Sequence, residues 1–192
     1  MNFGLIVEGP GDESAYPHII QRIRADSNLV HPPIPAWNKQ KLKGKFVGFL
    51  KHLDSKKHLQ LQKVFVIRDS DCRDPLPLEH ELLEIFQRSQ FHPHFQVHFH
   101  ATKCELETLL LGDVAAINQA AAVRGGAANA QPVNQRLEEL IDPKPVFMRT
   151  LSQAGLPVTP QVYGEIARQM NIQTVAQNCP DFRRFMQKVQ DC

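Results

Sequence analysis

Three short segments constrain the fold of this chain more than any other feature of its sequence: residues 2–8, 63–71 and 94–101. The first two contain a continuous apolar run and end in acidic residues, as strands buried on both faces of a sheet can do, and the third alternates apolar and polar side chains. Amphipathic helical patterns separate and follow them, over residues 12–25, 40–54, 78–86 and 105–122. This alternation predicts an α/β fold, with a parallel-rich sheet flanked by helices on both faces.

The last part of the chain shows helical patterns only. After a loop of small residues at 122–132 we expect, in order, a short helix near 133–141, a turn at "DPKP", and helices near 160–170 and 180–190. A chain of 192 residues is long enough for one full core and short for two. We therefore predict an α/β domain over residues 1–125, with a helical C-terminal extension over residues 126–192 packed on the same domain.

The cysteines and the apolar runs exclude several classes of protein. The cysteines are scattered and include no C-x-x-C pair, which argues against a disulfide scaffold or a zinc knuckle: Cys72, Cys104, Cys179 and Cys192. No apolar run approaches the roughly 18 residues of a membrane span, and the N-terminus lacks a signal-peptide pattern. We expect a soluble, reduced protein of the cytoplasm that makes no contact with a membrane.

Acidic residues gather where the predicted strands end. They form three clusters: Glu8 with Asp12 and Glu13, Asp69 with Asp71, and Glu105 with Glu107. A single acid at a strand end is usually a turn or capping residue, but the carboxyl ends of parallel strands share one edge of the sheet, where ligands bind. Converging carboxylates repel one another unless a cation compensates them. Their oxygen ligands favour Mg²⁺, or Mn²⁺ in its place.

Two further features suggest binding of an anion. Gly9 and Gly11 follow the first strand and allow a phosphate to approach backbone N–H groups at a helix start. Eight of the eleven lysines lie between residues 38 and 63, opposite a single acid, and four of them form the predicted nucleic-acid strip: Lys39, Lys41, Lys43 and Lys45. A solvated helix face would explain the same lysines equally well.

Taken together, these motifs resemble the Toprim fold, whose signature is Glu-Gly at the first strand end, Asp-x-Asp at a later one, and a further acid. The closer resemblance is to the small Toprim-like proteins of the DUF4276 family, related to the nuclease domain of OLD-family (overcoming lysogenization defect) proteins. "EGPGD" at residues 8–12 matches the opening motif of that group. "ELETLLLGD" at residues 105–113 matches a second motif, except that Leu109 replaces a tryptophan. The closing helices from residue 163 also look similar.

The resemblance implies a metal-dependent nuclease that cleaves DNA, or RNA, with two Mg²⁺ or Mn²⁺ ions. Glu8 would act as general base or shared ligand. Asp69 and Asp71 would hold one ion with help from Asp12, and Glu105 or Glu107 would serve the second. A positive side chain often completes such a site, and the candidates are Lys144, Arg68 and Lys103.

The resemblance also implies partners. Proteins of this group are often encoded beside an ABC/AAA-type ATPase, which suggests a role in antiviral defence or DNA processing. The chain itself lacks the P-loop motif, because "EGPGDES" has no lysine, so it is not the ATPase. A homodimer is also compatible with the sequence.

Three other interpretations remain open at this stage. The histidines of "HPHFQVHFH" at residues 92–100 share one strand parity and could bind a transition metal, although an ordinary half-buried strand shows the same alternation. The Asp-x-Asp of residues 69–71 also resembles haloacid dehalogenase phosphatases, but in those the motif follows the first strand. The chain could also be a non-catalytic, DNA-binding or regulatory subunit of an ATPase.

Overall fold

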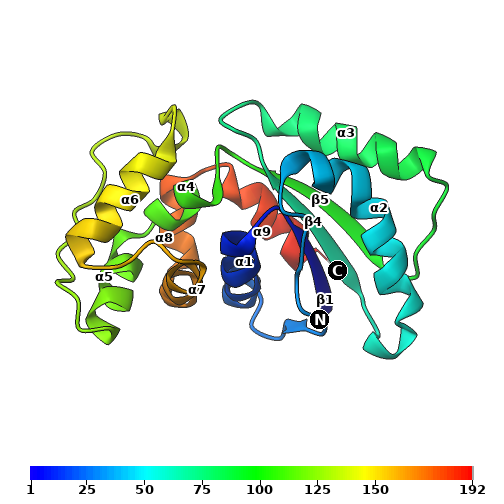
Figure 1. Ribbon diagram of the computed structural model, residues 1–192, viewed down its shortest axis with the longest axis horizontal. Coiled ribbons are helices and arrows are strands. Elements are labelled where there is room, and N and C mark those ends of the chain that lie inside the picture. The colour runs from blue at the N-terminus through cyan, green and yellow to red at the C-terminus, as the bar shows by residue number, and fades with distance from the viewer. Residues whose placement is uncertain (192) are drawn as a thin grey trace.

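A parallel β-sheet forms the centre of the protein (Figure 1). The computed structural model describes residues 1–191. Its strands are β1 (Asn2–Val7), β2 (Asn28–Leu29), β3 (Ile34–Pro35), β4 (Lys63–Asp69) and β5 (Gln96–Thr102). They lie in the order β2-β1-β4-β5, β3 pairs with the C-terminal end of β1, and all pairings are parallel. The predicted α/β fold class is confirmed, and the arrangement is consistent with a Toprim-like (Rossmann-like) fold.

Each face of the sheet is covered by helices (Figure 1). Those nearest the sheet are α1 (Pro10–Ile23), α2 (Lys39–Ser55), α3 (Pro75–Arg88) and α9 (Phe182–Gln190). Phe3 and Phe65 belong to the core cluster shared with α1 and α9, whereas Ile6 and Val64 belong to the cluster shared with α2 and α3. Burial of both faces explains why β1 and β4 are apolar at successive positions.

The other helices form a second group beside α1 (Figure 1). They are α4 (Leu106–Leu111), α5 (Val114–Val123), α6 (Pro143–Ala154), α7 (Pro160–Gln169) and α8 (Ile172–Asn178); short 3-10 turns occur at Lys57–Leu59 and Leu137–Glu139. Glycine allows α7 to lie directly on α1, because a Cβ at Gly164 would lie 2.5 Å from Ser14 Oγ. One apolar core runs from the sheet into this group. The domain boundary at residue 125 stays a prediction, and residue 192 lies outside the described residues.

The helix expected over residues 105–122 is in fact two helices, α4 and α5. Asp113 caps the second, since its Oδ1 accepts a hydrogen bond of 3.3 Å from the backbone N–H of Ala116. A side chain at Gly112 would have its Cβ 2.9 Å from the carbonyl oxygen of Leu109. The single-helix prediction is therefore wrong, because the apolar pattern continues across the break.

Three other expectations about helices are wrong. "DPKP" begins α6 instead of forming a turn, with Asp142 capping the backbone N–H of Lys144 at 3.2 Å and Pro143 at the first helical position. Helix α8 follows α7 after a short connection and was not expected. The first helix, expected from residue 12, begins instead at Pro10 and contains Pro17 in its interior. No helix in residues 1–191 combines the length and apolar character that a membrane span requires.

The histidines of β5 have separate partners. His98 stacks on Phe65, with 5.4 Å between ring centroids, and His100 packs on Phe185 at 4.7 Å. His94 pairs instead with Asp54 near the start of the strand. The strand is exposed or half-buried at its start and buried from Phe99 onward. Within residues 1–191 these side chains do not gather into a metal site.

Glu79 of α3 attaches the C-terminal helix to the sheet. Its carboxylate accepts hydrogen bonds from the guanidinium of Arg184 at 2.9 Å, the amine of Lys188 at 2.7 Å and the backbone N–H of Ala101 at 3.0 Å. Nδ1 of His100 lies 3.3 Å from the same carboxylate. Burial alone would raise the pKa of Glu79, but the contacts with His100 and Lys188 lower it to about 2.

Candidate functional site

An acidic cavity of about 400 Å³ lies at the carboxyl ends of the parallel strands. Glu8 directly follows β1, Asp69 ends β4, and the loop after β5 leads to Glu105. Five carboxylates line the cavity: Glu8, Asp12, Asp69, Glu105 and Glu107. The topology of a parallel sheet brings them together, because all three strands end at the same edge.

Glu8 and Asp69 come from neighbouring strands and are in direct contact. Glu8 Oε1 accepts a hydrogen bond of 3.2 Å from the backbone N–H of Asp69, and Nε of Arg68 lies 3.9 Å from the same oxygen. Burial nevertheless raises the pKa of Glu8, with nearby Lys39 acting in the opposite direction. Burial, and then the charges of Asp12 and Glu8, raise the pKa of Asp69 well above its usual range.

Asp12 is held at the start of α1. Its Oδ2 accepts a 3.0 Å hydrogen bond from the backbone N–H of Gly9, so the carboxylate caps the helix while its side chain stays buried. Burial, followed by the charges of Glu8 and Glu107, raises the pKa of Asp12 to about 7 despite that bond. A capping aspartate on the surface would keep its negative charge down to a pH well below 7. Burial and the neighbouring carboxylates therefore oppose ionisation of Asp12 in this cavity.

Glu105 lies directly before α4, and Glu107 lies in the first turn of that helix. Tyr163 of α7 donates a 2.9 Å hydrogen bond from its hydroxyl to Glu107 Oε1, which fixes that buried carboxylate. Oε2 of Glu105 is buried and has no hydrogen-bond partner in residues 1–191. Burial and the charge of Glu107 raise the pKa of Glu105, whereas Lys144 opposes the increase.

The donors of this cavity fit a hard divalent cation. The possible metal ligands are carboxylate oxygens, and four of the carboxyl groups have raised pKa values. One buried carboxylate oxygen also has no hydrogen-bond partner. Both features are expected where a bound cation would compensate the negative charge. Within residues 1–191, however, no three acidic, histidine or cysteine side chains are already arranged as a ligand set. Binding would therefore require the carboxylates to rotate toward a shared ion.

Asp71, which the sequence places with Asp69, lies apart from the other acids. The strand ends at Asp69, Asp71 has a left-handed backbone with φ of 51°, and its exposed carboxylate forms an ion pair with Lys39. It is absent from the described cavity lining. Glu13 also lies outside that lining, in the first turn of α1.

The expectation of reduced cysteines is wrong for two of them, since a disulfide joins Cys72 and Cys104. The strands β4 and β5 are neighbours, with Asp69 opposite Thr102, so the loops that follow them run side by side. The bond thereby links the loop carrying Asp71 to the loop carrying Glu105. Cys179 is free and buried, and Cys192 lies outside the described residues.

The three candidate cations occupy different places. Lys144 lines the cavity from the first turn of α6, with an exposed side chain. Arg68 lies beside Glu8 and also contacts Glu81 at 3.6 Å. The amine of Lys103 is directed elsewhere, donating to the carbonyl oxygens of Cys72 and Arg73. Of these three candidates, Lys144 and Arg68 are therefore placed to act on the carboxylates.

The predicted nucleic-acid strip of α2 divides into two faces. Lys39 pairs with Asp71, and Lys43 donates to Glu81 at 2.5 Å, so both are engaged by acids of this chain. Lys41 and Lys45, one helical turn apart, are exposed. Within the described residues, their amines make no hydrogen bond or ion pair.

The two glycines have local roles in the fold. The N–H of Gly9 donates to Asp12, and a Cβ at Gly11 would lie 2.9 Å from Cδ2 of Tyr163. Gly11 therefore allows α7 to approach the start of α1, whether or not a phosphate also binds there. Both glycines do line the cavity.

Besides Pro10, the walls are completed by residues that the sequence did not single out: Trp37, Asn38, Leu106, Val158, Pro160 and Tyr163. Two of them precede α2, one lies in α4, and the others come from the start of α7 and the loop before it. Trp37 carried a signal that could have been used, since it is the only tryptophan and follows a proline-rich segment directly before the lysines. Tyr163 had none, because a tyrosine in an amphipathic helix usually belongs to the core.

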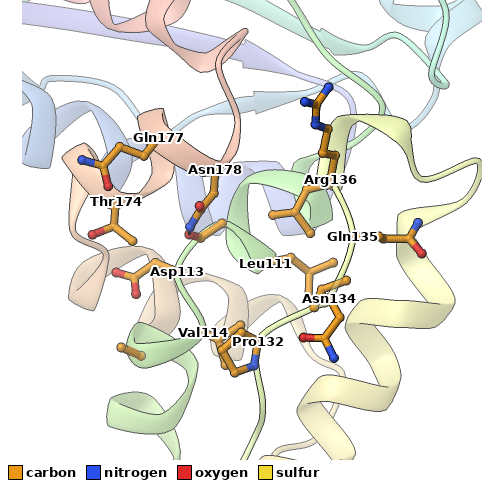
Figure 2. A pocket seen from close by; sticks show the side chains of 14 residues that line it. Leu111, Asp113, Val114, Pro132, Asn134, Gln135, Arg136, Thr174, Gln177 and Asn178 are labelled. Carbon is orange, nitrogen blue, oxygen red and sulfur yellow. Dashed lines mark hydrogen bonds between the residues drawn. The ribbon is translucent and has the colours of Figure 1, made fainter.

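A second cavity, of about 680 Å³, lies away from the acids, between the α4–α5 junction, residues 132–137 and α8. Figure 2 shows Thr174, Gln177 and Asn178 on one side and Pro132, Asn134 and Arg136 on the other. Its most polar groups already have partners: Asp113 Oδ2 accepts from the N–H of Asn171 at 2.8 Å, and Asn178 donates to the carbonyl of Gly112 at 2.8 Å. It therefore lacks the unsatisfied charge of the acidic cavity.

Comparison with known proteins places the chain in one family. No curated protein and no solved structure matches it. The family model described as "Domain of unknown function (DUF4276)" matches residues 7–190, which is nearly the whole chain and includes every lining residue of the acidic cavity. The chain belongs to the DUF4276 family.

Proposed function

We propose that this protein is a metal-dependent nuclease of the Toprim type, related to the nuclease domain of OLD-family proteins. The observation that carries the proposal is the convergence of five carboxylates in one cavity at the carboxyl ends of the strands. The Toprim signature has acids at the end of the first strand, at the end of a later strand and beyond it, and Glu8, Asp69 and Glu105 stand at such positions. Mg²⁺ or Mn²⁺, in two bound ions, is the proposed cofactor.

Each acid has a proposed role. Asp69 and Asp12 would hold one ion, and Glu105 and Glu107 the second, with Glu8 shared between them or acting as general base. Two bound ions would supply electrostatic stabilisation of the attacking and leaving oxygens of a phosphodiester. Tyr163 keeps Glu107 in position. Asp71 would join only if its ion pair with Lys39 opened.

The protein's own cations would position the substrate. Lys144, at the cavity wall, is the proposed catalytic cation, and Arg68 helps to orient Glu8. Lys41 and Lys45 are the residues of α2 best placed for phosphates, because Lys39 and Lys43 are engaged by acids. Gly9 and Gly11 would contact the phosphate nearest the cavity.

The wider proposal concerns partners and location. An ABC/AAA-type ATPase is the proposed protein partner, in an antiviral defence or DNA-processing system, and a homodimer is compatible with it. We also propose a cytoplasmic location, where nucleic acid is accessible. In that compartment the Cys72–Cys104 disulfide would form only transiently.

A cleavage assay tests the function. Plasmid DNA and a matching RNA are incubated with Mg²⁺ or Mn²⁺, with and without an ABC/AAA-type ATPase encoded beside the protein's own gene. We expect cleavage that EDTA abolishes and that Asp69→Asn reduces about 100-fold or more, since loss of a metal ligand removes several kcal/mol of transition-state stabilisation. The matched control is Glu139→Gln, an exposed acid in the Leu137–Glu139 turn. Equal cleavage by Asp69→Asn would contradict the assignment.

One observation favours a second function. Because the acids of residues 1–191 are not already arranged as a ligand set, the same fold could serve as a non-catalytic, DNA-binding or regulatory subunit of the ATPase. DNA binding without cleavage under every metal condition would favour that function. Hydrolysis of small phosphate esters would instead favour a phosphatase.

A further inference from the structure

Trp37 is the most conspicuous exposed apolar side chain beside the acidic cavity. It is the only tryptophan of the chain, its residue is 66% exposed, and it lines the cavity together with Asn38. Within residues 1–191 its indole takes part in no hydrogen bond and no ring contact. An exposed indole at the mouth of a candidate site, with no part in the core, indicates a surface that contacts a ligand.

The backbone holds Trp37 in this place. On its N-terminal side, β3 pairs with β1, and the N–H of the buried Ala36 donates to the carbonyl of Val7 at 2.8 Å. On its C-terminal side, Asn38 caps α2 by accepting from the N–H of Lys41 at 2.8 Å. Trp37 itself has a φ of 70°, a left-handed conformation that a bulky residue rarely adopts. Such strain at a site rim is typical of functional positions.

The cavity combines two chemistries. Its acids would attract a cation, but Trp37, the exposed Val158 and Pro160 offer apolar surface that neither a metal ion nor a phosphate uses. A volume of about 400 Å³ is within the usual size range of small-ligand sites. Lys41 follows four residues after Trp37 and is exposed, where it could meet a phosphate of the same strand.

We propose that Trp37 stacks on an unpaired base of the nucleic acid, and that the substrate is therefore single-stranded, or has an unpaired end. This rests on the proposed nuclease function. An aromatic side chain binds any base through its face, whereas bases inside a duplex have both faces covered by their neighbours. The indole would therefore favour single-stranded over double-stranded nucleic acid, without favouring any base sequence.

The single tryptophan allows a direct test. Its fluorescence is followed while a phosphorothioate single strand, and separately a blunt-ended duplex of the same sequence, is added with Ca²⁺ in place of Mg²⁺. We expect saturable quenching by the single strand, and at least tenfold weaker binding of the duplex. Equal affinity for both, or binding without any change in fluorescence, would overturn the proposal.

Variants separate stacking from general binding. With labelled oligonucleotides, Trp37→Ala should weaken single-strand binding about tenfold, and Trp37→Phe should restore most of it, because stacking is worth a few kcal/mol per base at most. The control is Val123→Ala, which truncates another exposed apolar residue, on α5. Melting temperatures of all three variants show whether the fold is kept.

The possible failures are distinguishable. If Trp37→Ala binds and cuts single strands as the wild type does, the stacking proposal is wrong and the nuclease proposal stands. If no nucleic acid binds and none is cut, the nuclease proposal falls, and the stacking proposal with it. Quenching by the ATPase alone would reassign Trp37 to a protein interface and overturn stacking.

Discussion

Two partly buried acidic regions of this molecule differ in the direction of their pKa shifts. Glu79 lies among Arg184, Lys188 and His100, and its pKa is lowered to about 2. The acids of the cavity lie mainly among one another, and the pKa values of Glu8, Asp12, Asp69 and Glu105 are raised. The first region is a completed ion network, whereas the second carries more negative charge than its cations balance.

We infer from this difference that Glu79 serves the fold, whereas the cavity acids serve the proposed metal site. Glu79 connects α3 to α9, so its burial contributes to the fold. The cavity acids oppose folding when they are ionised, and a chain selected for stability alone would replace some of them with neutral residues. Their presence at one edge of the sheet is explained if a divalent cation supplies the missing charge.

The largest expected effect comes from breaking the Glu79 network. Glu79→Gln should lower the free energy of unfolding by about 3 kcal/mol near pH 7, because it leaves Arg184 and Lys188 partly buried without their carboxylate. Since the folded pKa is lowered, the contribution is present above about pH 4.5 and disappears as the pH falls through about 2.

Urea denaturation measures this effect. The matched control is Glu84→Gln on the same helix, whose surface pairs with His80 and Arg88 should be worth less than about 0.5 kcal/mol. Equal unfolding free energies for the Glu79→Gln and Glu84→Gln variants would show that Glu79 does not stabilise the fold. The contrast between Glu79 and the cavity acids would then be wrong.

The second largest expected effect is an increase in the free energy of unfolding. Asp12→Asn should raise the free energy of unfolding by on the order of 1–2 kcal/mol at about pH 8 in EDTA, because the amide removes a charge while its oxygen still accepts from Gly9. The folded pKa is raised from 3.8 to about 7, so the stability due to the protonated Asp12 is present below about pH 4 and is lost as the pH rises through 7. The gain should therefore vanish at about pH 4.

The comparison for this variant is Asp26→Asn, an exposed acid whose pKa is lowered by Arg24. It should give no gain at any pH. Denaturation curves at several pH values in EDTA test both variants. A loss of stability for Asp12→Asn at alkaline pH would show that its charge is already balanced in the folded protein.

The smallest expected change in stability comes from replacing Lys144, the lysine that lines the cavity. Lys144→Met should raise the pKa of Glu105 further and lower the metal-free stability by less than about 0.5 kcal/mol, since the side chain is exposed. Carboxyl NMR titration measures the pKa directly. Lys45→Met, outside the described cavity lining, is the control, and an equal change in the pKa of Glu105 would exclude a local action of Lys144.

The sequence was most informative where local pattern and topology agree. The apolar character of β1 and β4 predicted buried parallel strands, and the shared edge of such a sheet then predicted that Glu8, Asp69 and Glu105 would meet. Parallel pairing fixes which ends lie together, so no knowledge of side-chain contacts was needed.

The rest depends on contacts between distant segments. Asp71 turns outward because the chain takes a left-handed conformation after Ser70, and nothing in Asp-Ser-Asp reveals that turn. The Cys72–Cys104 bond follows from the register of β4 with β5, across 32 residues of sequence. Tyr163 reaches Glu107 because helix α7 packs against α4 as well as α1.

Calorimetric titration with Mn²⁺ at about pH 8 tests the central claim most directly: the cavity acids are held for a divalent cation. The wild type should bind Mn²⁺ saturably, release protons on binding, and melt at a higher temperature when loaded. Asp69→Asn should lose most of this binding while staying folded. Absence of binding to the wild type, or undiminished binding to Asp69→Asn, would contradict the account.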